Sequence, residues 1–165
     1  MKEVNVKQAL EKKYPESVVL LTSSSSSGKA NIITLGWSMQ TSFDPPMLAV
    51  SIGKTRYSHK LVSQTKEFVL CFPSQGQEED VLFCGTHSGH EVDKFVSTNL
   101  RPVKAKFVKP PLLENSVACF ECKIVESVET GDHTIFVGEI VASYISEKPQ
   151  KRIYNFGKYH LKVIE

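Results

Sequence analysis

The chain lacks any marked excess of charge of one sign. Its 165 residues include 20 Lys and Arg and 18 Asp and Glu, which gives a formal net charge of +2. A domain dedicated to nucleic acid is usually strongly basic, because its cations must neutralise phosphates. The near balance of charge therefore argues against nucleic acid as a partner.

Long hydrophobic runs are absent as well. The longest, such as residues 18–21 and 68–72, fall far below the roughly 20 residues that a membrane-spanning helix needs. Residues 1–14 mix lysines with single apolar residues and contain no continuous apolar segment of the secretory type. We therefore expect a soluble protein in the cytoplasm, with no membrane partner.

Cysteine is scarce, with four residues at Cys71, Cys84, Cys119 and Cys122. In a chain without an export signal we expect reduced thiols and not a disulfide framework. Hydrophobic residues make up 41% of the sequence, and a chain of this length can bury enough surface to fold without a covalent or metal staple. We predict a single domain over residues 1–165.

Short, apolar, β-branched segments dominate the sequence. Strands are predicted at 17–22, 30–35, 47–52, 67–72, 116–129 and 134–144, and helices at 6–13, 56–65 and 77–84. The Ser-rich residues 23–29 are predicted to form a flexible hairpin loop, because the spacing of a P-loop is missing. Strands and helices do not alternate regularly, which favours an all-β antiparallel barrel or sandwich over a Rossmann sheet.

The predicted strand 116–129 shows clean alternation. It places Ala118, Phe120, Cys122, Ile124 and Val128 on one face and Glu121, Lys123, Ser127 and Glu129 on the other, exposed face. Residues 130–132 supply turn chemistry, so this strand is predicted to form a hairpin with 134–144. Gly138, in the middle of the returning strand, indicates a bulge or a close approach by another group.

Two cysteine patterns invite a metal or redox interpretation. Cys119 and Cys122 are three residues apart in a strand, so their side chains point to opposite faces, and we interpret them as ordinary strand residues. Cys84, His87 and His90 have workable ligand spacing but supply only three ligands, whereas structural zinc requires four. We favour a polar loop there, keep a metal site as the alternative, and assign no residue to a metal.

Three further features are candidates for a ligand site. Arg56, Tyr57 and Ser58 open a helix, where N–H groups, the helix dipole and these side chains suit one phosphate; a plain surface helix start is the alternative. The segment 37–42 suits the edge of a planar heteroaromatic ring, or else forms a bulge with a core tryptophan. His133 follows a turn and is either an exposed turn residue or, over a pocket, an acid, base or cofactor contact.

The order of these segments carries a family resemblance. It runs through residues 31–39 (NIITLGWSM), 44–52 (DPPMLAVSI), 56–59 (RYSH), 84–95 (CGTHSGHEVDKF) and 131–141 (GDHTIFVGEIV), and it covers nearly the whole chain. In this order the sequence resembles the flavin reductase-like family, the FMN-binding split barrels that include the flavoredoxins. The resemblance implies a six-stranded antiparallel Greek-key split β-barrel, a homodimer, and one FMN per subunit near the dimer interface.

The resemblance also implies a set of cofactor-binding residues. The isoalloxazine ring is expected against Trp37, Ser38, Met39, Thr41 and Ser42, and the ring and phosphate against Ser51, Ile52, Gly53, Arg56, Tyr57 and Ser58. Ser88, Gly89 and Lys94 match a further binding segment, in which His90 stands where the family pattern has Arg. We expect Lys94 near N1 and the C2 carbonyl of the flavin, where a cation favours the reduced ring.

Two oxidoreductase functions follow from the resemblance. The first is an NAD(P)H-dependent flavin reductase, with the nicotinamide stacked on the flavin near His133, which we assign as the catalytic residue. The second is an electron carrier of the flavoredoxin type, which exchanges electrons with a redox protein and needs no nicotinamide site. The third hypothesis is a non-catalytic barrel that binds a metal or another ligand through Cys84, His87 and His90.

Overall fold

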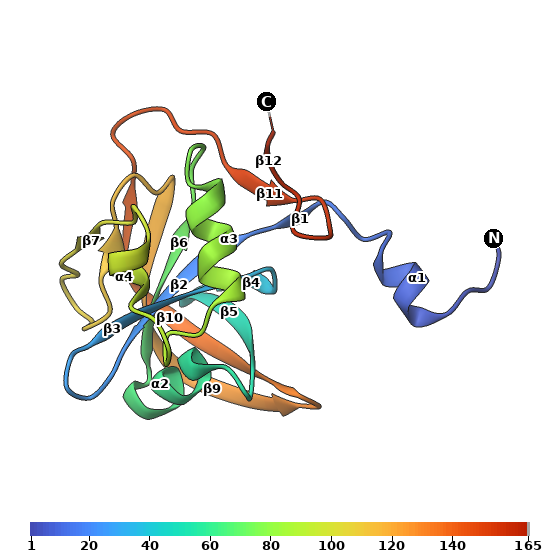
Figure 1. The fold of residues 1–165 in the computed structure, drawn as a ribbon. Helices are drawn as coiled ribbons and strands as arrows, with labels where there is room; N and C mark the ends of the chain where they lie inside the picture. The colour runs from blue at the N-terminus through green and yellow to red at the C-terminus, as the bar shows by residue number, and fades with distance from the viewer. Residues whose placement is uncertain (165) are drawn as a thin grey trace.

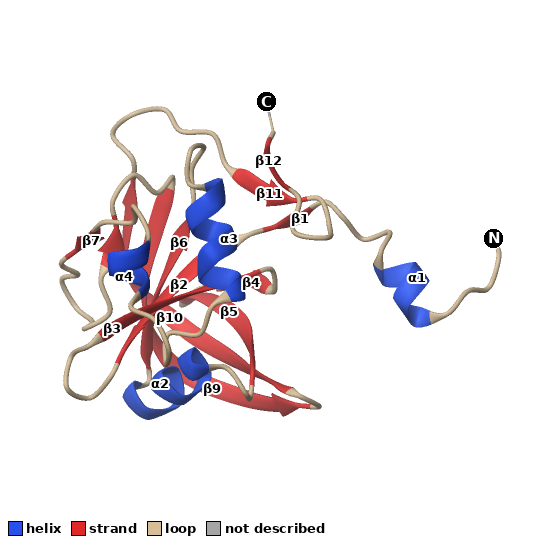
Figure 2. Ribbon diagram, viewed as in Figure 1, coloured by secondary structure: helices blue, strands red, loops and turns tan. Residues whose placement is uncertain are grey.

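The main sheet of the protein contains seven antiparallel strands (Figures 1 and 2), and the computed structural model describes residues 1–164. The strand order across the sheet is β3-β2-β6-β9-β10-β5-β4. The bounds are β2 Val19–Ser24, β3 Ala30–Leu35, β4 Ser38–Phe43, β5 Pro46–Gly53, β6 Glu67–Phe72, β9 Ala118–Thr130 and β10 His133–Ile145. Because β3 at one edge contacts β5 near the other, the sheet curls into an open barrel. The predicted all-β class is confirmed.

The seventh strand corrects the expected number of six. Ser38–Phe43, predicted only as a segment between strands, pairs with β5 and forms the edge strand β4. The pairing contains a register shift between Gln40 and Ser42. Trp37, just before this strand, is 50% exposed and is therefore not a core residue.

Helices and two smaller sheets lie around the main sheet. α3 lies across its front and contacts β3, whereas α1 stands apart from the rest of the protein (Figure 1). The bounds are α1 Val6–Leu10, α2 Tyr57–Thr65, α3 Glu78–Thr86, α4 Lys94–Ser97, β1 Glu16–Ser17, β7 Pro102–Val103, β8 Leu112–Leu113, β11 Ile153–Asn155 and β12 Leu161–Val163. Within residues 1–164, no helix is both long and apolar enough to cross a membrane.

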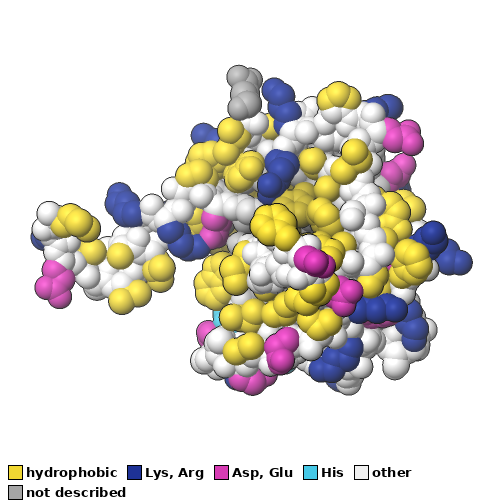
Figure 3. Space-filling view, turned by 180° about the vertical axis from the view of Figure 1, so that it is seen from behind, with side chains coloured by type: hydrophobic (Ala, Val, Ile, Leu, Met, Phe, Trp, Pro, Cys, Tyr) yellow, Lys and Arg dark blue, Asp and Glu magenta, His cyan; other side chains and the backbone are white. Residues whose placement is uncertain are grey.

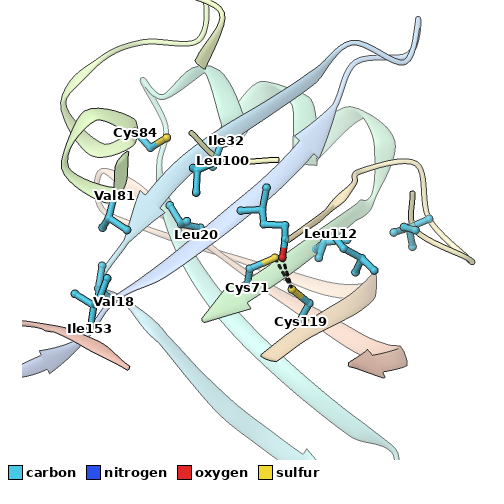
Figure 4. Packing of buried hydrophobic residues seen from close by; sticks show 14 residues of the cluster. Val18, Leu20, Ile32, Cys71, Val81, Cys84, Leu100, Leu112, Cys119 and Ile153 are labelled. Carbon is cyan, nitrogen blue, oxygen red and sulfur yellow. Dashed lines mark hydrogen bonds between the residues drawn. The ribbon is translucent and has the colours of Figure 1, made fainter. Parts of the chain in front are cut away.

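Two hydrophobic clusters lie on opposite faces of the sheet. Because side chains alternate along a strand, Leu21 of β2 enters an inner cluster inside the barrel, with Phe68 and Phe136. Leu20 enters an outer cluster between the sheet and α3, which Figure 4 shows. β2 is therefore buried on both faces.

Gly138 of β10 confirms the predicted close approach. A Cβ atom at this position would lie 2.9 Å from Cys122 Cβ and 2.9 Å from Phe68 Cε1, both in the inner cluster. A register shift against β9 occurs at the same place, between Val137 and Gly138. The barrel interior has no room for a side chain there.

Two expectations of exposure are wrong for reasons of packing. Glu121, predicted on an exposed face, is 0% exposed and accepts hydrogen bonds from the backbone N–H groups of residues 106–108 and from the Tyr144 hydroxyl. A segment distant in the sequence covers this side of β9, which alternation along one strand cannot reveal. Ser23 and Ser24, predicted in a flexible loop, extend β2 and are fully buried.

Candidate functional site

Two adjacent cavities open where β3, β5 and the start of α2 meet. The first, called here the Arg56 cavity, has a volume of about 110 Å³ and is lined by Ile33, Thr55, Arg56, Tyr57, Ser58, Cys84, Gly85, His87, Ser88, Gly89 and Lys94. The second, the Trp37 cavity, has a volume of about 190 Å³ and is lined by Ile33, Thr34, Leu35, Gly36, Trp37, Ser51, Gly53, Arg56, Gly85 and His133. Because they share Ile33, Arg56 and Gly85, the two cavities lie side by side, and together they are called here the groove.

Two cations face the Arg56 cavity without a carboxylate partner. Lys94 is 4% exposed, and its Nζ donates hydrogen bonds to the carbonyl oxygens of Ile32 (2.8 Å) and Cys84 (2.7 Å). Burial lowers the pKa of Lys94, and the nearby charge of Arg56 lowers it further. Within residues 1–164, neither cation forms an ion pair with a carboxylate. A buried cation without a counter-charge is costly, so an anion in this cavity would be strongly favoured.

The start of α2 supplies further donors to the same cavity. Arg56 is the N-cap residue, and its side chain makes no capping hydrogen bond. The His59 N–H donates to the Arg56 carbonyl, which leaves the N–H groups of Tyr57 and Ser58 for a ligand. The buried Ser58 hydroxyl accepts a hydrogen bond from Asn31 Nδ2 at 2.7 Å. Gly89 lies so close to Asn31 that a Cβ atom there would overlap the Asn31 side chain. These contacts lock β3, α2 and the loop before α4 around the cavity.

Trp37 and His133 form one wall of the Trp37 cavity. Their ring centroids are 4.7 Å apart, with an angle of 40° between the ring planes. The Ser51 N–H donates to the Trp37 carbonyl at 3.0 Å, which fixes the backbone on that side. His133 Nδ1 lies 2.7 Å from Asp132 Oδ1, and this hydrogen bond lowers the pKa of Asp132. The arrangement leaves Nε2 of His133 as the ring nitrogen available to a ligand.

The turn that carries His133 is fixed to the loop between β5 and α2. The Lys54 N–H donates to the Asp132 carbonyl at 3.0 Å, and Lys54 Nζ donates to the Gly131 carbonyl at 3.1 Å. Lys54 Nζ also lies 2.7 Å from the Glu129 carboxylate, and the hydrogen bond it donates is the main cause that lowers the pKa of Glu129. The imidazole therefore keeps a defined position at the mouth of the groove.

Four residues expected at the flavin ring lie away from the groove. Ser38 and Met39 help to line a separate cavity of about 300 Å³ on the outer face of the sheet, beside Trp37. Thr41 and Ser42 lie farther along β4 and line neither the groove nor this cavity. The Ile52 side chain is 0% exposed in the inner cluster, so only its backbone is left for a ligand.

The alternative metal ligands are not brought together. His87 Nδ1 is within hydrogen-bond distance of the Phe83 carbonyl, and its ring stacks on Phe83 at a centroid distance of 4.0 Å. The His90 ring meets the Tyr57 ring edge-on at 5.7 Å, and Cys84 is buried on the face of α3 that packs in the outer cluster. Within residues 1–164, no three His, Cys, Asp or Glu side chains lie close enough to hold a metal ion.

The groove collects most of the residues that the resemblance implied, which are Trp37, Ser51, Gly53, Arg56, Tyr57, Ser58, Ser88, Gly89, Lys94 and His133. Lys94 lies in the Arg56 cavity and not in the Trp37 cavity. Sequence reasoning assigned no role to Asn31, which contacts the groove residue Ser58, or to the lining residues Ile33, Thr34, Leu35, Gly36, Thr55 and Gly85. A polar residue at the start of an apolar strand was the one available signal for Asn31.

Two known proteins are similar to this chain in sequence over most of its length. It is 41% identical over 132 residues to an uncharacterized protein of Archaeoglobus fulgidus, covering 80% of this chain and 73% of that protein. It is 26% identical over 147 residues to an NADH-dependent FAD reductase of Streptomyces globisporus, covering 88% of this chain and 79% of the reductase.

Solved structures share the whole fold. The FMN-binding protein from Thermus thermophilus with bound p-hydroxybenzaldehyde has a TM-score of 0.87 at 27% identity, over 99% of this chain and 94% of that chain. Flavoredoxin from Methanosarcina acetivorans has a TM-score of 0.86 at 27% identity, over 100% and 91%. The family model of the flavin reductase like domain matches residues 11–162. The resemblance seen in the sequence is thus confirmed, and the chain belongs to the flavin reductase-like family.

Proposed function

We propose that the protein is an FMN-binding oxidoreductase of the flavin reductase type. The observation that carries the proposal is the pair of cations, Arg56 and the buried Lys94, that face one cavity without a carboxylate partner in residues 1–164. The FMN phosphate would lie in this Arg56 cavity, and the isoalloxazine ring in the adjoining Trp37 cavity. The single domain over residues 1–165 and the cytoplasmic location stay predictions from the sequence.

The donor set of the Arg56 cavity fits a phosphate. A guanidinium, an ammonium group, the N–H groups at a helix start and the Ser58 hydroxyl can all donate to phosphate oxygens. Lys94 uses two of its three donors on backbone carbonyls and keeps one for a ligand. We therefore move the role of Lys94 from the flavin N1 to the phosphate. The FMN-binding relative of known structure supports the same cofactor.

The groove suits a flavin that is open to a second reactant on one side. Bound FMN would supply the redox chemistry, because it accepts a hydride or single electrons. Trp37 and His133 would border the ring, and the turn held by Lys54 would keep the imidazole at the entrance. We propose that a nicotinamide enters past His133, with Nε2 as its contact. The NADH-dependent relative supports a nicotinamide donor.

The test is the visible spectrum of the full-length protein with FMN, followed by titration with NADH and with NADPH without oxygen. We expect a bound-flavin spectrum that bleaches with at least one of the two. Protein that stays colourless in excess FMN would contradict the flavin site. Bound flavin that ignores both nucleotides but is reduced by a ferredoxin system would identify an electron carrier, as in the flavoredoxin relative.

His133→Ala separates nicotinamide contact from flavin binding. We expect it to slow bleaching by the nicotinamide while FMN still binds, because the imidazole lies at the entrance and Arg56 and Lys94 remain. His160→Ala, an exposed histidine that lines neither cavity of the groove, is the matched control. Equal bleaching rates in the two variants would show that His133 does not contribute to reduction by the nicotinamide.

We further propose a homodimer that forms through the outer face of β4, β5 and β10. The strand register aligns Met39, Ala49 and Val137 across this face. Met39 is 61% exposed and Phe43 is 88% exposed, and hydrophobic side chains are visible across the rear of the molecule (Figure 3). An apolar patch beside an edge strand is a surface that a second copy covers. Light scattering should give a dimer that Met39→Glu disrupts; a monomeric wild type contradicts the proposal.

A further inference from the structure

Two buried cysteines face each other across neighbouring strands. Cys71 of β6 and Cys119 of β9 are direct partners in the register, and their sulfurs are 3.0 Å apart (Figure 4). Both side chains belong to the outer cluster, with exposures of 0% and 5%. Both are free thiols, and neither lines the flavin groove.

The position of the pair in the ladder suits a bond between the sulfurs. The Ile124 N–H donates to the Lys66 carbonyl at 2.9 Å, whereas the Lys66 N–H donates to Val62, so this single bond places the hydrogen-bonded phase of the ladder at Lys66 and Ile124. From there the register runs without a shift to Phe72 opposite Ala118. Bonded and non-bonded pairs alternate, and Cys71 is an odd number of residues beyond Lys66, so the cysteines form a non-hydrogen-bonded pair. Their Cα atoms are then about 4.5 Å apart, within the range of roughly 4.4–6.8 Å seen in disulfides.

The surroundings favour this pair over the other two thiols. The hydrogen bond between the Cys71 and Cys119 sulfurs lowers the pKa of Cys119 to about 7, although burial opposes this effect. The nearby hydroxyl of Ser116 lowers the pKa of Cys119 in the same direction. Burial instead raises the pKa of Cys84 and of Cys122 to about 12. The reactive thiolate form is therefore most accessible at Cys119.

We propose that Cys71 and Cys119 are a modification site, at which hydrogen peroxide forms a disulfide between β6 and β9. The Cys119 sulfur attacks one peroxide oxygen, the O–O bond breaks, and the released hydroxide takes up the Cys119 proton to give water. The resulting sulfenic acid is attacked by the Cys71 sulfur; the S–S bond forms, the S–O bond breaks and a second water leaves. Two thiols lose two electrons in total, and one peroxide is reduced to two waters.

The crosslink acts on the fold and not on the flavin groove. It joins residues that are 48 positions apart in the chain, between two strands at the centre of the sheet. Because a crosslink restricts the unfolded chain, the oxidised protein should melt at a higher temperature than the reduced protein. The proposal does not rest on flavin binding, and it is tested on protein without FMN.

The test starts from reduced full-length protein. It is incubated with excess hydrogen peroxide and treated with catalase. It is then unfolded in urea that contains N-ethylmaleimide, and its mass is measured by mass spectrometry. We expect the reduced protein to take up four labels, one for each free cysteine, and the oxidised protein to take up two. The unlabelled mass should fall by about 2 Da, the mass of two hydrogens. Trypsin should link peptide 67–94 to peptide 107–123, and because each holds two cysteines, fragmentation of the linked pair should place the bond at Cys71 and Cys119 and the labels at Cys84 and Cys122.

Cys122→Ala is the matched control, because Cys122 is buried on the same strand but pairs with Phe68. This variant should still form the disulfide. Cys71→Ala and Cys119→Ala should each form none, and two separate variants keep the test valid if one folds poorly. Four labels after oxidation, a link that contains Cys84 or Cys122, or addition of oxygen without a crosslink would overturn the proposal.

Discussion

Arg56 offers the most direct test of the cofactor site. It borders both cavities, and within residues 1–164 its guanidinium forms no ion pair with a carboxylate. Its side chain also makes no capping hydrogen bond to α2. Arg56→Ala therefore removes the proposed phosphate ligand without removing an interaction that holds the fold. We expect weaker FMN binding and an unchanged melting temperature of the FMN-free protein.

The size of the effect follows from the exposure of Arg56. A hydrogen bond to a charged group contributes about 1.5–3 kcal/mol. Because Arg56 is exposed, solvent screening favours the lower part of that range. A loss of about 1.5–2 kcal/mol raises the FMN Kd by roughly 10- to 30-fold. Arg56→Lys keeps the charge but loses the planar fork of donors, so its FMN Kd should lie between those of the wild type and Arg56→Ala.

Titration of FMN fluorescence measures these dissociation constants. Lys60→Ala is the matched control, because Lys60 is an exposed cation one turn further along α2 that lines neither cavity. Its long-range charge is screened, so we expect its Kd to change by less than about threefold. If Arg56→Ala weakens binding no more than Lys60→Ala does, the phosphate does not lie at the start of α2 and the reasoning fails.

Two further predictions concern a buried carboxylate and a glycine. Glu121→Ala leaves four donors without an acceptor, so urea unfolding should show a loss of about 3 kcal/mol; wild-type stability would contradict the buried network. Although burial raises the pKa of Glu121, hydrogen bonds from Tyr144 and three backbone N–H groups lower it overall. The contribution of Glu121 to folding stability is therefore complete above its unfolded pKa of about 4.3 and is lost as pH falls through the lower folded pKa. Glu121→Gln should lack this pH dependence. Gly89→Ala should displace the Asn31 side chain and raise the FMN Kd. Gly131→Ala is the control, because a Cβ atom there would meet no atom within 4 Å, and it should bind FMN like the wild type. Equal Kd values for the two variants would show that Gly89 does not shape the FMN site.

Most strands could be predicted because apolar, β-branched runs mark them. β6 has the predicted bounds, Glu67–Phe72. β4 could not be predicted in this way, because its sequence SMQTSF has no apolar alternation and it becomes a strand through pairing with β5. The burial of Glu121 was missed for a related reason. Alternation assigns a side chain to a face, but only the tertiary fold brings residues 106–108 over that face.

The site could be predicted only in part from residue chemistry. The residues at 56–58 suit a phosphate by themselves, but chain order cannot show that Gly89 and Lys94 reach the same cavity. That grouping came from the family resemblance. Asn31 was missed because its role depends on contacts with two distant segments. The Cys71 pairing was hidden as well, since it requires the register of β6 against β9.

For the proposed flavin site, the contacts among Asn31, Ser58 and Gly89 also determine when the protein can take up the cofactor. The three residues come from distant parts of the chain, so no shorter fragment contains a complete pocket. A nascent chain leaving the ribosome must bring β3, α2 and the loop before α4 together before it can capture a flavin. For the same reason, a protease that cuts this loop would release the flavin from a barrel whose strands are still intact.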